Sequence, residues 1–152
     1  MTQPHILVTG GTRGIGAAIV EALTARGARV AAHGRADGPT SIGADLAEPG
    51  AADGLWNRAL DRLDGRIDVL VNNAGVFEAA PVGASADDWR AAWARTMQVN
   101  LQAAADLSRH AVLHWQARAA PGRIVNIASR AAHRGDSPDY CTMRRQRPAW
   151  SP

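Results

Sequence analysis

A run of glycines near the start of the chain has the composition and spacing of a phosphate-binding turn. Residues 9–16 read T-G-G-T-R-G-I-G and lie between an apolar run at 5–9 and a segment in which apolar residues recur at helical spacing. Glycines let the backbone turn sharply and approach a phosphate, while the following helix offers free N–H groups and the positive end of its dipole. The alternative is an ordinary glycine-rich turn. The position after the first apolar run favours phosphate binding.

The elements that would hold this turn follow from the alternation of apolar runs and helical segments. We expect helices at 14–26 and 51–63 and one or two more within 86–118. The runs that predict strands are 5–9, 28–33, 40–44, 66–71 and 123–128. Strands that are apolar throughout and alternate with helices indicate a parallel sheet covered on both faces. The sequence therefore predicts an α/β fold of the Rossmann type, an incomplete doubly wound parallel sheet of about five strands.

Composition and length narrow the class of protein. The 152 residues fit one domain, and 46% apolar with 20% charged residues is typical of a globular protein. No run approaches the roughly 18 apolar residues of a membrane span, and the first strand begins too early to leave room for a signal peptide. The single cysteine, Cys141, excludes an intrachain disulfide and a cysteine-cluster metal site. We therefore expect a cytoplasmic protein with no membrane partner and no metal.

The high pI of about 10.3 comes from one end of the chain. All 17 basic residues are arginine, and three of them are Arg144, Arg145 and Arg147. The remaining 14 balance the 14 acidic residues. A nucleic-acid-binding protein concentrates its basic charge on a folded face, so we predict no nucleic-acid partner.

Three motifs, in order, resemble those of the short-chain dehydrogenase/reductase family. They are G-x-x-x-G-x-G at 10–16, N-N-A-G at 72–75 and N-I-A-S at 126–129, and the resemblance runs from residue 5 to about residue 140. It implies an NAD(P)-dependent oxidoreductase that transfers hydride between a nicotinamide cofactor and a small alcohol or carbonyl substrate. It also implies a homo-oligomeric parent enzyme. We accordingly assign residues 1–140 to a partial NADP-binding domain and residues 141–152 to a tail unlike the rest.

The resemblance assigns a cofactor site residue by residue. Gly10, Gly14 and Gly16 match the glycines under the pyrophosphate, and Asp45 matches the acid that touches adenine, although an aspartate there is also typical of a helix N-cap or a turn. Asn73, Ala74 and Gly75 match the motif that braces the sheet beside the adenosine half. The same loop adds three residues to the predicted site: Thr12, Arg13 and Ile15.

The choice between NADP and NAD has a physical basis. An NAD site usually places an acid at the end of the second strand, where it accepts from the ribose 2′-hydroxyl. Here that end reads H-G-R at 33–35, and no acid follows until Asp37. Arg13 and Arg35 are suited to gripping a 2′-phosphate with paired donors, although either could simply be solvated. We predict NADP(H) rather than NAD.

Two residues are assigned to catalysis by the resemblance. Asn100 matches an active-site asparagine that helps to hold a proton-relay water, and a mid-helix asparagine is otherwise unfavourable. Ser129 matches the serine that hydrogen-bonds the substrate oxygen, while Asn126 is interpreted as structural. The family's proton donor is a tyrosine with a lysine four residues later, which tunes it. This chain has no lysine, and its single tyrosine, Tyr140, is followed four positions later by Arg144. We interpret Tyr140 as non-catalytic.

The tail has a possible origin in the reading frame. One permitted set of codons for residues 141–152, read from its third base, translates as H-Y-A-A-S-K-A-G-M-V-A, which contains the absent Y-x-x-x-K pattern. The resulting hypothesis is a frameshift just after the Tyr140 codon, which makes the chain the N-terminal part of a dehydrogenase, truncated and inactive as it stands. Two alternatives stay open: a non-catalytic nucleotide-binding remnant, and an interaction module that dimerises through the segment 86–118.

Overall fold

A five-stranded parallel sheet forms the centre of the molecule. The computed structural model describes residues 3–129 and 138–140, so the predicted tail at 141–152 lies outside the described residues. The strand order is β3-β2-β1-β4-β5, and every neighbouring pair is parallel. The strands are β1 (His5–Val8), β2 (Arg29–Gly34), β3 (Ser41–Gly43), β4 (Val69–Asn72) and β5 (Arg123–Asn126).

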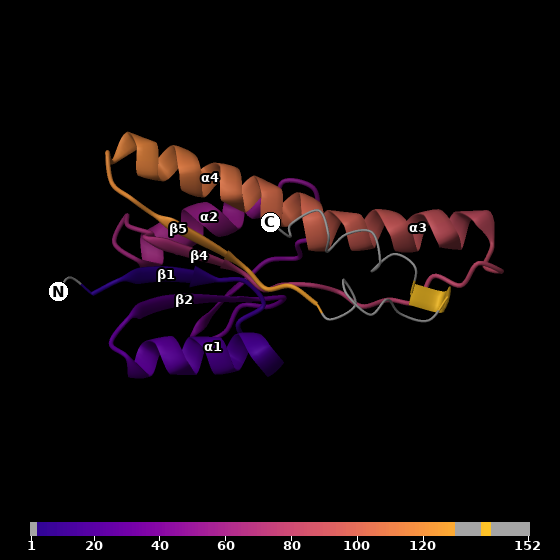
Figure 1. The fold of residues 1–152 in the computed structure, drawn as a ribbon, viewed down its shortest axis with the longest axis horizontal. Helices are drawn as coiled ribbons and strands as arrows, with labels where there is room; N and C mark the ends of the chain where they lie inside the picture. The colour runs from indigo at the N-terminus through magenta and orange to yellow at the C-terminus, as the bar shows by residue number, and fades with distance from the viewer. Residues whose placement is uncertain (1–2, 130–137, 141–152) are drawn as a thin grey trace.

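Helices cover both faces of this sheet. One face carries α1 (Gly14–Ala25), and the other carries α2 (Ala51–Arg62) and α4 (Ala103–Ala117), as Figure 1 shows. A further helix, α3 (Ala86–Met97), leads into α4 through a π-helical segment, η1 (Gln98–Gln102). A short 3-10 turn, η2 (Pro138–Tyr140), also belongs to the described part. The predicted Rossmann-type α/β fold is confirmed.

Alternate residues of the central strand supply the two halves of the core. Ile6 and Val8 pack on one side with Leu23 of α1. Leu7, which is fully buried, packs on the opposite side with residues of α2 and α4 such as Leu55. Since successive side chains of a strand point to opposite faces, a strand that is apolar throughout requires cover on both. This is why HILV forms the middle of the sheet.

The segment 86–118 differs from a plain helix. The structure divides it into α3 and α4, with the wider π turn between them. Ser85 begins α3 as its N-cap, because its Oγ accepts a hydrogen bond from the Asp88 backbone N–H at 3.1 Å. No such capping residue stands at the π turn, so composition alone could not locate it.

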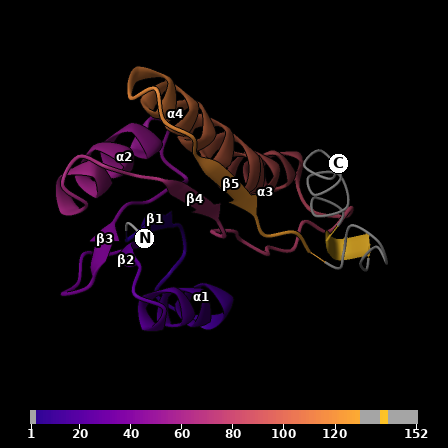
Figure 2. The same ribbon diagram turned by 60° about the vertical axis from the view of Figure 1, so that its left-hand side comes forward.

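The last strand lies at the edge of the sheet. Figure 2 shows β5 beside β4 and below α4. Within the described ranges no strand pairs with its outer edge, and Val125 is 37% exposed. Over the same ranges, no helix is both long and apolar enough to cross a membrane.

Candidate functional site

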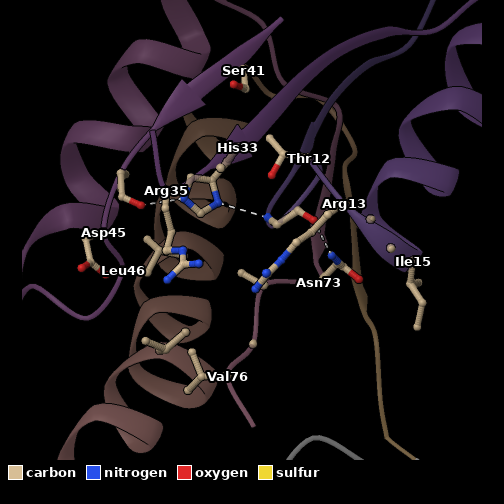
Figure 3. A pocket seen from close by; sticks show the side chains of 18 of the residues that line it. Thr12, Arg13, Ile15, His33, Arg35, Ser41, Asp45, Leu46, Asn73 and Val76 are labelled. Atoms are coloured by element: carbon tan, nitrogen blue, oxygen red, sulfur yellow. Dashed lines mark hydrogen bonds between the residues drawn. The ribbon is translucent and has the colours of Figure 1, made fainter. Parts of the chain in front are cut away.

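A large cavity opens where the carboxyl ends of β1, β2 and β4 meet. Its volume is about 1040 Å³, and Figure 3 shows a close view of it. All eleven residues that the sequence assigns to the cofactor lie in its wall. They are Gly10, Thr12, Arg13, Gly14, Ile15, Gly16, Arg35, Asp45, Asn73, Ala74 and Gly75.

The glycine turn between β1 and α1 is closely packed against its surroundings. Gly10 has a φ of +63°, and a Cβ there would lie 2.9 Å from the Ala74 Cα. A Cβ on Gly16 would lie 2.0 Å from the Gly10 carbonyl oxygen. Larger residues would therefore displace the backbone, and this explains why glycine is needed at both positions.

Side chains after β1 and β4 tie this turn to the sheet. The Asn73 side-chain N–H₂ donates to the Thr9 carbonyl at 2.9 Å and to the Gly10 carbonyl at 3.1 Å. The Thr9 hydroxyl oxygen accepts from the backbone N–H groups of Asn73 and Ala74, at 3.0 and 2.9 Å. Thr9 is 2% exposed, so these bonds are shielded from water. They fix one wall of the cavity against the other.

The glycine turn leaves a positive rim on the cavity. The N-terminal turn of α1 contains no acidic residue, and a Cβ built on Gly14 would meet no atom within 4 Å. Figure 3 shows the Arg13 and Arg35 side chains extending into the same space. Neither guanidinium has an ion-pair partner in the part of the chain that the structure describes. Open space, free backbone N–H groups and two guanidinium groups suit a phosphorylated ligand.

The acid that follows β2, Asp37, and the acid that follows β3, Asp45, have different surroundings. The Asp37 carboxylate accepts from the Gly43 backbone N–H at 2.8 Å and pairs with Arg58. The Gly43 bond, followed by the Arg58 bond, lowers the Asp37 pKa. Asp45 lies in the cavity wall, and its Oδ1 also accepts from the Ala47 backbone N–H at 3.0 Å, so the turn role weighed from sequence is present. Asp37 is thus held in a turn, away from the cavity lining.

Asn100 lies inside the π turn, and both polar atoms of its side chain bond to the backbone of Val76. Its Oδ1 accepts from the Val76 backbone N–H at 2.7 Å, and its Nδ2 donates to the Val76 carbonyl at 2.9 Å. Val76 follows the N-N-A-G motif and lines the large cavity. Wider π turns often occur at functional sites because they re-aim backbone groups. The amide of Asn100 therefore connects α3–α4 to the end of β4.

Ser129 comes directly after Ala128, which lines a second, smaller cavity of about 40 Å³. Asn100, Asn126 and Ala128 are among the residues that line this small cavity. The Asn72 Nδ2 donates to the Asn126 Oδ1 at 2.9 Å, which joins β4 to β5 and agrees with the structural interpretation of Asn126. Of the two residues predicted to be catalytic, Asn100 thus lines this small cavity, and Ser129 is one residue beyond the lining in the sequence.

Tyr140 has a contact that the sequence did not predict. Its ring stacks on Phe77, with centroids 4.1 Å apart and planes within 4°. The adjacent Asp139 carbonyl accepts from the Ala80 backbone N–H at 2.6 Å. Phe77 lines the large cavity, so Tyr140 lies beside it. That Tyr140 is non-catalytic stays a prediction.

Sequence reasoning missed half of the cavity lining. The residues it did not assign are His33, Gly34, Ala36, Ser41, Ala44, Leu46, Val76, Phe77, Glu78, Arg95 and Val99. Most of these have no distinctive type or spacing. His33 is the exception, because a histidine at the end of an otherwise apolar strand is a recognisable signal. Among the described residues, no group of three histidine, cysteine or carboxylate side chains could hold a metal ion.

Comparison with known proteins identifies the family to which this fold belongs. The parallel sheet, the glycine turn and the switch in strand order beside β1 define a dinucleotide-binding type of α/β protein. The family model described as "short chain dehydrogenase" matches residues 4–141. The chain belongs to the short-chain dehydrogenase/reductase family, and the predicted resemblance is confirmed.

Individual relatives agree with this assignment. The chain is 36% identical to L-xylulose reductase of Bos taurus over 153 residues, which cover 91% of this chain and 59% of the reductase. A short-chain dehydrogenase from Burkholderia cenocepacia, solved with NADP, is 31% identical with a TM-score of 0.80 and covers 96% of this chain and 63% of its own. A 4-hydroxyisoleucine dehydrogenase solved with NADH is 27% identical with a TM-score of 0.83, covering 97% and 64%. The chain spans slightly more than half the length of the curated relatives it matches.

Proposed function

We propose that the large cavity binds a nicotinamide dinucleotide and that the parent enzyme is an oxidoreductase of alcohol or carbonyl substrates. The observation that carries this is the convergence of all eleven motif residues on one cavity. When bound, the cofactor supplies or accepts the hydride. Gly10, Gly14 and Gly16 would face its pyrophosphate, and Asp45 its adenine. Asn73, Ala74 and Gly75 would border the adenosine half, with Thr12 and Ile15 completing the loop.

NADP(H) is the cofactor that the cavity rim favours. Arg13 and Arg35 extend into the cavity without an ion-pair partner in the described part of the chain. The first acid after β2, Asp37, is already engaged by Gly43 and Arg58, so it does not stand ready for a ribose 2′-hydroxyl. Related structures contain NADP in one case and NADH in another. The two arginines therefore support NADP(H), and measuring the affinity of the chain for NADPH and for NADH tests this choice.

The test is a titration of the purified chain with NADPH and with NADH, followed by the change in nicotinamide fluorescence. We expect saturable binding of NADPH and weaker binding of NADH. Gly16→Val is the matched variant, because its side chain would overlap the Gly10 carbonyl, and it should abolish binding. Gly54→Val on α2 controls for the same change elsewhere, since a Cβ there meets nothing within 4 Å. Failure of the unsubstituted chain to bind either cofactor would contradict the proposal.

A second candidate is a nucleotide-binding remnant without turnover. It is favoured by the sequence, which contains no lysine to complete the family's Y-x-x-x-K pattern. Asn100 and Ser129 would position a water and a substrate oxygen, but neither side chain is a proton donor of suitable pKa. A cofactor-binding chain with no turnover over a panel of secondary alcohols and ketones would select this candidate.

The proposed oxidoreductase also carries two further expectations. They are a cytoplasmic location and a homo-oligomeric full-length enzyme.

A further inference from the structure

A buried histidine links the two segments that flank the nucleotide cavity. His33 lies on β2 and is 4% exposed. Its Nδ1 accepts a hydrogen bond from the Gly10 backbone N–H at 3.1 Å, and its Nε2 lies 3.0 Å from the Ala44 carbonyl oxygen. Figure 3 shows both bonds as dashed lines on opposite sides of the ring. The ring thus spans the gap from the glycine turn to the segment that carries Asp45.

These partners determine the protonation state of the ring. The Gly10 N–H is a donor, so Nδ1 must be without a proton. The Ala44 carbonyl is an acceptor, so Nε2 must carry one. A protonated ring would turn a second N–H toward Gly10 and lose that bond. Only the neutral tautomer protonated at Nε2 satisfies both partners.

The surroundings of the ring favour this neutral form. Burial, the largest influence, lowers the His33 pKa, while the Ala44 bond and the Asp45 charge act in the opposite direction. The charged side chains around the same cavity come from five segments. They are Arg13 on the glycine turn, Arg35 at the end of β2, Asp45 after β3, Glu78 after β4 and Arg95 on α3. Glu78 and Arg95 pair with each other at 2.8 Å, and Asp45 is the carboxylate that acts on His33.

The bond to Gly10 restrains a glycine of the turn whose φ is positive, at +63°. The Gly10 carbonyl is already held by Asn73 from β4, and His33 holds its N–H from β2. The Gly11 N–H also donates to the His33 carbonyl at 2.7 Å. A glycine held on one side only would sample more conformations and lose more entropy when a ligand orders it. Holding the turn before the ligand arrives therefore strengthens binding.

We propose that His33, in its neutral form, is a positioning residue that holds the glycine turn and the Asp45 segment at the separation required by the cofactor. The inference rests on the proposed function, because the ligand is the nicotinamide dinucleotide. The ring does not act on the reaction. Its effect is on the affinity for the cofactor and on the mobility of the Gly10 amide in the free chain.

Two substitutions separate hydrogen bonding from filling of space. His33→Leu fills much of the same volume but removes both bonds. His33→Asn leaves a gap, yet its side-chain oxygen can take the place of Nδ1 and accept from Gly10. We expect the dissociation constant for NADPH to rise about tenfold in His33→Leu, as loss of a satisfied buried partner implies, and less than about threefold in His33→Asn. Ile42→Val, a buried change outside the cavity lining, controls for general loss of stability and should leave affinity unchanged.

Hydrogen exchange in the free chain gives a second readout that needs no cofactor. The Gly10 amide should exchange faster in His33→Leu than in the unsubstituted chain, whereas His33→Asn should retain most of its protection. Equal NADPH affinity in all variants, or a loss that follows side-chain volume instead of hydrogen bonding, would overturn the inference. If the unsubstituted chain binds no NADPH, the proposed function fails, and Gly10 exchange still decides whether His33 holds the turn.

Discussion

The two parts of the sheet on either side of β4 differ in how well their strands are buried and paired. Around β1 and β2, the residues Leu7, Val8 and Ala31 are fully buried, and the glycine turn is bonded from both neighbouring strands. At β5, three of four residues are exposed and one edge has no partner among the described strands. The glycine turn that lines the cavity belongs to the part around β1 and β2, and Ser129 follows β5. The proposed cofactor site and Ser129, which is predicted to be catalytic, therefore belong to parts of the sheet that differ in burial and pairing.

The same difference separates the residues assigned to the cofactor from those assigned to catalysis. Every residue assigned to the cofactor lies within 10–75, where the sheet is covered on both faces. Of the residues assigned to catalysis, Ser129 follows the exposed strand β5, and Asn100 lines a small cavity together with Asn126 of that strand. Affinity for a dinucleotide should thus survive in this chain even where turnover does not.

The largest expected effect concerns turnover. We predict that the 152-residue chain has no measurable dehydrogenase activity, and that restoring a Y-x-x-x-K motif with its natural downstream sequence restores it. A positioned general acid typically contributes a factor of about 10² to 10⁴, and the lysine of the motif would return with it. The assay is the absorbance change of NADPH or NADP⁺ with a panel of ketones and secondary alcohols. Turnover by the chain as it stands, lost in Tyr140→Phe, would instead make Tyr140 the catalytic tyrosine.

The frameshift hypothesis has a test of its own. Sequencing the DNA across codons 138–152 shows directly whether another reading frame contains the Y-x-x-x-K motif.

A smaller effect should follow from reversing the charge at the end of β2. Arg35→Asp removes a guanidinium from the cavity rim and supplies the acid typical of NAD sites. We expect NADPH affinity to fall by roughly ten- to a hundredfold, as loss of a charge-assisted hydrogen bond implies, while NADH affinity holds or rises. Arg26→Asp makes the same charge change at the exposed C-cap of α1, away from the cavity. An equal loss in both variants would mean that Arg35 acts only through overall charge.

The exposed edge strand predicts limited solubility. An apolar strand with an open edge can pair with other chains, and Val125 is the exposed apolar residue of β5. Val125→Lys should lower aggregation severalfold in light-scattering assays, because a charge at an edge opposes strand pairing. Val112→Lys, at an exposed position on α4, is the matched control. A monodisperse unsubstituted monomer that melts cooperatively well above 50 °C would contradict this.

The smallest expected effect is on stability in mild acid. Burial lowers the pKa of His33 and of His114 below the ordinary value of 6.5. Below that pH the unfolded chain takes up more protons than the folded chain, so the free energy of unfolding falls as the pH drops toward the lowered values. Urea midpoints at pH 7.5 and pH 5 should show the decrease, and a substitution at His33 should reduce it. Equal midpoints at the two pH values would show that these histidines titrate normally.

The fold was predictable from sequence because its signals are local. The runs 5–9 and 66–71 read as strands, and the glycines at 10–16 read as a turn, because each depends on residue types within a few positions. The residues of the proposed cofactor site were assigned for the same reason, since sequence signals alone placed them on one turn and its neighbours. The π turn at Asn100 and the ring of His33 were missed as structural devices, because both depend on partners that are distant along the chain: Val76 for the first, Gly10 and Ala44 for the second.

The boundary of β4 shows the same limit on a smaller scale. The apolar pattern predicted a strand from residue 66, whereas β4 begins at Val69. Asp68 intervenes, since its carboxylate accepts from the His5 backbone N–H at 2.9 Å and from Arg66 at 2.7 Å. A side chain thus takes the place of a ladder bond. Only the pairing with β1 reveals this.

The π turn also constrains how this segment tolerates insertions and deletions. A π turn holds one residue more than an α turn, and successive residues of an α-helix are rotated by about 100° around its axis. Removing two residues from 98–102 would therefore exceed what the turn can absorb and would rotate α3 against α4 by about that angle. Asn100 would then face away from Val76, and Thr96, now fully buried, would turn toward a different neighbour. Length changes of this size should therefore be accepted in the loop before α3 and rejected in this five-residue segment. The spacing between the N-N-A-G motif and Asn100 can vary by that much, while the spacing from Asn100 to the buried Leu107 of α4 cannot.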